Sequence, residues 1–206
     1  MRKVAKQIEM ANGVAVFGER FFLPEPGIFI GLFSPEEMKG ANFADDPVMR
    51  LKVFDLPAKK MKYIFEGDRL RIEDYGFREP TDSQLGSELF RVAHAIYDKL
   101  QPKAFGFNYD TIYRFDSIIP QVEILGKFIA PSMQEQVKDF GWQYTLMKDR
   151  GRNLETFFFK AVSPIEIRIH ANYHFNEGVF SSPEKIQQQF EKCYTAIDEV
   201  IERMAF

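Results

Sequence analysis

The stretch IEIRIHANYHF, residues 165–175, alternates apolar and polar side chains at every step. A period of two is typical of a β-strand that buries one face and exposes the other to water. This stretch therefore predicts a sheet with one apolar face and one face rich in charged, amide and imidazole groups. Its polar side chains are Glu166, Arg168, His170, Asn172 and His174.

A long helix is predicted directly after this strand, over residues 183–204. Ser181 or Ser182 is a candidate N-cap, and Pro183 suits the first helical position. Glu184 is placed to complete a capping box with Ser181. We expect the apolar stripe of this helix to pack on the apolar face of the strand. The stripe comprises Ile186, Phe190, Cys193, Ile197, Val200 or Ile201, and Met204.

The composition limits the classes of protein to consider. The chain has 206 residues with 22 phenylalanines, and 45% of its residues are hydrophobic. A chain of this length can bury a substantial core, so we expect a single α+β domain over residues 1–206 with an aromatic interior. The formal net charge is −3 and the sequence pI is about 5.7, which makes a nucleic-acid partner unfavourable.

Cysteine and histidine usage gives no sign of a metal site. The single cysteine, Cys193, excludes a disulfide within the chain and a cysteine-based metal cluster. His170 and His174 on one strand would stand about 13 Å apart, too far to bind one ion, so no metal is predicted and the cofactor is unknown. We find neither a signal peptide nor an apolar run of membrane-spanning length, and therefore expect a cytoplasmic protein with no membrane partner.

The first half of the chain, residues 1–102, is predicted to be a strand-rich unit closed by a helix. Asn12-Gly13 lies between two apolar runs, which is a strong β-hairpin signal. Residues 40–47 show no period and are expected to form a loop. The predicted strands cover 4–10, 14–17, 28–33, 49–56, 60–65 and 69–75, and the helix covers 82–101.

The second half, residues 103–206, follows a similar order. Residues 104–115 predict a strand with an aromatic face, whereas 118–129 fit either a helix or a strand. Leu70-Arg71-Ile72 and Ile167-Arg168-Ile169 occupy equivalent places before the two long helices, which indicates an internal duplication of a meander-plus-helix unit. A helix at 131–140 and a hairpin of strands 142–147 and 154–162 complete this half.

Together these elements predict an α+β fold with a mostly antiparallel, curved sheet and two long helices on one face. The element order resembles duplicated α+β folds such as tandem ferredoxin-like or saddle-shaped sheets. A final helix against a sheet is also similar to helix-grip ligand carriers. These are likenesses of architecture, and architecture alone does not give a function.

A candidate ligand site follows from a hypothesis about strand order. If residues 104–115 neighbour residues 165–175, the polar side chains of both strands form one patch. Such a patch could bind an anionic small molecule or perform acid–base chemistry. The simpler alternative is a wet sheet surface with cross-strand ion pairs. The patch would comprise Asn108, Asp110, Arg114, Glu166, Arg168, His170, Asn172 and His174.

Three functions remain open at this point. The leading interpretation is a non-enzymatic binding or interaction module, with a protein partner or self-association through the uncovered sheet face or an edge strand. The second is a carrier of a small apolar ligand in a Phe- and Tyr-lined cavity between the sheet and the C-terminal helix. The third is an enzyme, for which Asp110, Arg168 and His170 would have to converge in a cleft.

Overall fold

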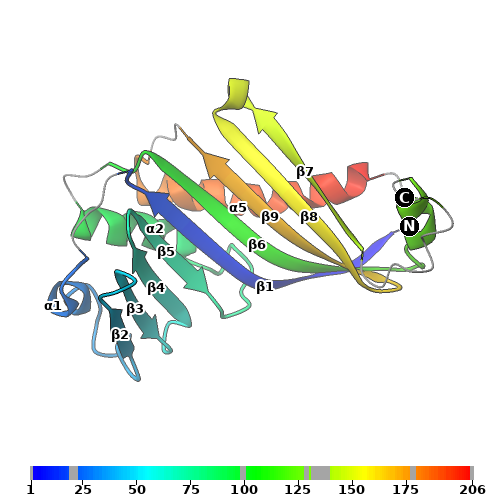
Figure 1. The fold of residues 1–206 in the computed structure, drawn as a ribbon. Coiled ribbons are helices and arrows are strands. Elements are labelled where there is room, and N and C mark those ends of the chain that lie inside the picture. Colours follow the sequence, from blue (N-terminus) through cyan, green and yellow to red (C-terminus); the bar gives the residue numbers. More distant parts are fainter. Residues whose placement is uncertain are drawn as a thin grey trace.

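The computed structural model describes residues 2–18, 23–97, 101–127, 130, 140–176 and 180–204. Its strands form one antiparallel sheet of nine strands, in the order β2-β3-β4-β5-β1-β6-β9-β8-β7 (Figure 1). The predicted mixed α+β class with an antiparallel sheet is confirmed. The strands are β1 (Lys3–Val16), β2 (Asn42–Asp46), β3 (Leu51–Leu56), β4 (Met61–Glu66), β5 (Arg69–Asp74), β6 (Ala104–Phe115), β7 (Gly141–Lys148), β8 (Asn153–Ser163) and β9 (Glu166–Phe175).

Two long helices, α2 (Leu85–Ile96) and α5 (Pro183–Arg203), pack on one face of this sheet and on each other (Figure 1). Helix α5 begins as predicted, with Ser182 as its N-cap accepting a hydrogen bond from the Lys185 N–H at 3.3 Å. None of the described helices combines the length and the hydropathy needed to cross a membrane. The short helices are α1 (Pro26–Ile30), α3 (Gln121–Gly126) and the 3₁₀ turn η1 (Asp149–Gly151).

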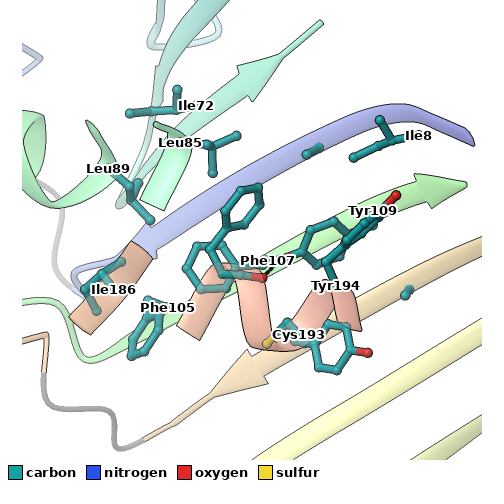
Figure 2. Close-up of a cluster of buried hydrophobic side chains, with 14 of the residues drawn as sticks. Ile8, Ile72, Leu85, Leu89, Phe105, Phe107, Tyr109, Ile186, Cys193 and Tyr194 are labelled. Atoms are coloured by element: carbon teal, nitrogen blue, oxygen red, sulfur yellow. Dashed lines mark hydrogen bonds between the residues drawn. The ribbon is translucent and has the colours of Figure 1, made fainter. Parts of the chain in front are cut away.

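The core lies between the sheet and the long helices α2 and α5, and the aromatic face of β6 is at its centre (Figure 2). Phe107 and Tyr109 are fully buried. The Tyr109 hydroxyl donates to the Phe190 carbonyl of α5 at 2.5 Å, and the Tyr113 hydroxyl donates to the Asp198 carboxylate at 2.6 Å. These bonds satisfy phenol groups that would be costly to bury alone, and they hold α5 along β6.

The two halves of the chain place their strands in a similar way. In each half the first strand, β1 or β6, pairs with the last strand of its own meander, β5 or β9, and a long helix follows that last strand. Strands β1 and β6 pair with each other and join the halves at the centre of the sheet. The polar sides of β1, β6 and β9 consequently meet on the face opposite the long helices.

The predicted hairpin at Asn12-Gly13 was wrong, because β1 is one continuous strand from Lys3 to Val16. A Cβ atom on Gly13 would stand 2.7 Å from Cδ2 of Leu85 on α2, so the missing side chain makes room for the helix. Asn12 faces the other way, and its side chain accepts a hydrogen bond from Asn108 at 2.7 Å. A local turn signal was overridden here by packing on both faces of the sheet.

Other boundaries also differ from the sequence predictions. The run 28–33 lies partly in helix α1, where Pro26 occupies the first turn and Phe29 is fully buried, rather than in a strand. The expected loop 40–47 contains the edge strand β2, and the ambiguous segment 118–129 contains helix α3. The predicted helix 82–101 is shorter, since α2 ends at Ile96. The helix predicted at 131–140 falls almost wholly outside the described residues.

Candidate functional site

A row of side-chain amides crosses the centre of the open face, which is the sheet face opposite α2 and α5. Asn12, Asn108 and Asn172 stand on β1, β6 and β9 at directly paired positions. The Asn172 amide donates to the Asn108 carbonyl, and the Asn108 amide donates to the Asn12 carbonyl. The Asn12 NH₂ and the Asn172 carbonyl at the two ends of the row form no side-chain hydrogen bond to the described residues, so they are available to a ligand.

The next row contains Asp110 and His170, which also pair directly across β6 and β9. The imidazole Nδ1 lies 2.8 Å from the Asp110 carboxylate. This hydrogen bond raises the pKa of His170 above its usual value, although partial burial opposes the rise. The pair therefore places next to the amide row an imidazole that keeps its proton to a higher pH than an ordinary histidine does.

We expect the His170 pKa to fall toward its ordinary value in Asp110→Asn, because the carboxylate no longer stabilises the imidazolium. A raised pKa adds stability below about pH 6.5, and this stability is lost as the pH rises through the pKa of the folded protein. Proton NMR titration of His170 measures the shift directly. The gap in unfolding midpoint between wild type and variant should be wider at about pH 5.5 than at about pH 8.5; a gap independent of pH would contradict this assignment.

Among the other predicted site residues, Arg114, Glu166 and Arg168 form ion pairs near the Asp110–His170 pair. Arg114 binds Glu166 at 2.7 Å, and Arg168 binds Glu9 of β1 at 2.9 Å. His174 contacts the side-chain oxygen of Asn176 at 2.7 Å. Strands β6 and β9 are thus neighbours, as the patch hypothesis required. Arg168 turns to Glu9, so it does not join Asp110 and His170 in the convergence that the enzyme hypothesis called for.

A hollow of about 580 Å³ lies on the open face, and all three asparagines of the amide row line it. Of the eight residues predicted for the site, Asn108, His170, Asn172 and His174 line it. Its floor is the cross-strand row Arg71, Val14, Gly106 and His174, where Gly106 contributes no side chain. The remaining polar lining comes from residues that sequence reasoning missed, namely Asn12, Glu66, Arg69 and Arg71.

Arg71 is the most informative of the missed residues. Its Nε atom is buried and has no hydrogen-bond partner in the described part of the chain, and the nearest carboxylate oxygen recorded for it, on Glu73, is 3.5 Å away. A buried donor without an acceptor is unfavourable, and a ligand oxygen would relieve it. The alternation in 69–75 could have placed Arg71 on a wet face, but only the pairing of β5 with β1 places it beside the Asn row.

The opposite, helix-covered face is occupied by packed rings. Phe190 of α5 stacks on Tyr109 with ring centroids 5.3 Å apart and also contacts Phe107. Phe157 and Phe159 are fully buried on this face, while Phe158 between them is 39% exposed on the open face. The aromatic residues predicted to fill the interface between sheet and helices do so.

Cys193 lies inside this packed face. Burial raises the pKa of its thiol to about 12, so the thiolate needed for nucleophilic chemistry is disfavoured. Within the described residues no group of three or more His, Cys, Asp or Glu side chains is arranged to hold a metal ion. The comparisons add no family assignment: no protein-family model matches the chain, and a search of curated proteins found no match.

Proposed function

We propose that this protein is a binding module whose open sheet face takes a small polar anion, held in the hollow between the amide row and Arg71. The observation that carries the proposal is the buried Arg71 Nε, which makes no hydrogen bond within the described residues and has the Glu73 carboxylate only at 3.5 Å. It lies at a hollow whose volume of about 580 Å³ is within the range of small-molecule sites. A carboxylate or phosphate group supplies the paired acceptor oxygens that a guanidinium group binds.

The charge and polarity of the lining support an anion. Glu66 is the single carboxylate in the lining, which also contains Arg69, Arg71 and two histidines. Arg69 and Arg71 each have one carboxylate outside the lining, Asp68 and Glu73, at the long distance of 3.5 Å. His170 pairs with Asp110 at 2.8 Å. The Asn12 NH₂ group and the Asn172 side-chain carbonyl form no side-chain hydrogen bond to the described residues. The first adds a donor, and the second adds an acceptor for a ligand hydroxyl or N–H. The ligand class that fits is therefore a hydroxylated or amide-bearing carboxylate or phosphate.

Arg71→Met is expected to weaken binding of such an anion at least about tenfold, because a charge-assisted hydrogen bond is lost. Arg114→Met is the matched control, since Arg114 lies on the same face but outside the hollow and pairs with Glu166. The probes are inorganic phosphate, citrate and a nucleoside monophosphate. Binding of each probe is measured as the rise in Tm on thermal unfolding. At about a hundred times its Kd, a ligand adds about 2.7 kcal/mol, or about 5 to 10 °C in Tm.

The proposal fails if none of the three anions raises the Tm of the wild type, or if Arg71→Met and Arg114→Met respond alike. Native mass spectrometry of the purified chain gives an independent reading. Additional mass that disappears on denaturation would identify a ligand retained through purification, and its value would narrow the chemical class.

A second candidate use of the same face is acid–base catalysis, which the 2.8 Å contact between Asp110 and His170 favours. A carboxylate that orients an imidazole is the usual support for a general base. His170→Gln separates the two uses, because it should abolish turnover of a bound anion while weakening its binding only modestly. A loss of binding as large as that of Arg71→Met would argue for a binding role alone.

We also retain self-association and internal duplication as proposals. Leu146 and Met147 of the outermost strand β7 are 40% and 77% exposed, which suits pairing of this strand with a second copy. Light scattering on Met147→Lys would show a dimer dissociating if β7 is the contact. The shared order of a central strand, a meander and a helix in both halves supports a duplicated unit.

A further inference from the structure

A second hollow, of about 520 Å³, runs along the flank of α5 on the helix-covered side of the sheet. We name it the α5 groove and define it by Phe105, Tyr173, Phe175, Lys185, Ile186 and Lys192, which all line it. Ile186 and Ala196 both border it and lie ten positions apart on α5, so the groove follows about 15 Å of helix. Its length suits an extended chain molecule.

The buried wall of the groove contains a hydroxyl without a partner. Tyr173 is only 1% exposed, and its hydroxyl makes no hydrogen bond within the described residues. Its ring is held edge-on by Tyr109 and Phe157, at centroid distances of 6.0 and 5.7 Å, so the side chain is packed in place. A buried phenol without an acceptor among the described residues is unfavourable, and an acceptor beside it would stabilise it.

The lining is apolar around the two rings at one end. Phe105 and Phe175 stack at 4.9 Å, and both border the groove together with the buried side chain of Ile186. Apolar surface of this kind binds hydrocarbon, because water is displaced from both sides. The groove therefore accommodates an apolar body as well as a hydrogen-bonding group.

Two lysines provide the complementary charge. Lys185 and Lys192 lie two turns apart on α5, both border the groove, and neither forms an ion pair with a described residue. In contrast, the third lysine of the lining, Lys148, is bound to Glu155 at 2.7 Å. The carboxylate of Glu199 is next to Arg203, at 3.6 Å. The lining also contains Asp149, whose carboxylate accepts a hydrogen bond from the Asn153 side chain. The groups of the lining without an ion pair among the described residues are therefore the two lysines and this one carboxylate, which leaves an excess of positive charge.

We infer that the α5 groove is a second ligand site, which takes a carboxylate with an apolar chain, such as a medium-chain fatty acid. The chain would lie against Phe105, Phe175 and Ile186, the carboxylate would be bound by Lys185 and Lys192, and the Tyr173 hydroxyl would donate to an oxygen acceptor of the ligand. This site is on the helix-covered side of the sheet, whereas the open-face hollow is on the other side; Phe105 and Tyr173 border both, and Lys185, Ile186 and Lys192 border the groove alone.

The test is calorimetric titration of the full chain with octanoate, decanoate and laurate, with native mass spectrometry to count bound molecules. One laurate per chain is expected, and affinity should rise about fourfold for each added methylene, which corresponds to about 0.8 kcal/mol. The double variant Lys185→Gln/Lys192→Gln should bind laurate at least about tenfold more weakly. Lys39→Gln/Lys127→Gln makes the same change of charge at exposed positions outside the groove and should bind as the wild type does.

Tyr173→Phe tests the buried hydroxyl without adding volume. It should weaken laurate binding about threefold to tenfold while leaving the Tm unchanged or raised, because the hydroxyl has no partner to lose. Arg71→Met should bind laurate normally, which separates this site from the open-face hollow. Absence of laurate binding, uptake of many molecules without saturation, or equal affinity in both double-lysine variants would each overturn the inference.

Discussion

Glu88→Gln is expected to lower the free energy of unfolding by about 2 to 4 kcal/mol. Glu88 of α2 is 5% exposed, and its carboxylate is bound by the Arg91 guanidinium through two hydrogen bonds, at 2.7 and 2.8 Å. The Tyr63 hydroxyl of β4 donates to the same group, and the Lys59 ammonium lies 3.2 Å from it. In Glu88→Gln, the cations Arg91 and Lys59 would face a neutral amide. Arg91 also donates a hydrogen bond to the Leu32 carbonyl.

The pH dependence gives this prediction a distinctive signature. Burial alone would raise the pKa of Glu88, but the hydrogen bonds from Arg91 and Tyr63 outweigh it and hold that pKa below the usual value. A depressed pKa contributes stability above the ordinary Glu value, and the contribution is lost as the pH falls through the folded-state pKa. Urea unfolding should therefore show wild type and Glu88→Gln converging in acid and diverging near neutral pH.

Glu166→Gln is the matched control, because Glu166 makes its ion pair with Arg114 at the surface. This variant should unfold at nearly the same urea concentration as the wild type. If Glu88→Gln and Glu166→Gln lost similar stability, the contacts of Glu88 with Arg91, Tyr63 and Lys59 would not be what holds α2 on β4.

The elements predicted correctly from sequence are those whose signals are local and repeated. Strand β9 alternates over its whole length, and α5 combines a Ser-Pro start with an apolar stripe of several turns. In contrast, Asn12-Gly13 is a two-residue signal with two physical explanations, a turn or a close approach. The close approach of Leu85 to Gly13 depends on α2, which lies far along the chain and cannot be inferred from the dipeptide.

The candidate site was predicted only as far as one strand pair. Alternation in both strands placed Asn108, Asp110, His170 and Asn172 on the polar faces, whereas the direct pairs Asn108–Asn172 and Asp110–His170 follow from the register of the sheet. Arg71 could not be added, because it joins the site through β5 pairing with β1 and β1 with β6. Strand order arises from the packing of the whole sheet, and no single stretch of the sequence encodes it.

Gly86→Ala is expected to destabilise the fold by about 2 kcal/mol, although alanine normally favours a helix by about 1 kcal/mol over glycine. A Cβ atom on Gly86 of α2 would stand 2.7 Å from the Cα of Gln187 and 2.9 Å from the carbonyl oxygen of Ile186 on α5. Both are backbone atoms, so the helices must move apart. The movement also threatens the start of α2, where Gly86 N–H and Ser87 N–H donate to the Gln187 side chain at 3.0 and 3.2 Å.

Gly27→Ala provides the contrast for this prediction, since it makes the same substitution in helix α1 at a position where a Cβ would meet no atom within 4 Å. That variant should be unchanged or stabilised by about 0.5 to 1 kcal/mol. Urea unfolding of both variants measures the difference directly. A Gly86→Ala variant as stable as Gly27→Ala would mean that α2 and α5 can separate at no cost, and that the close contact of the two long helices does not hold the halves of the sheet together.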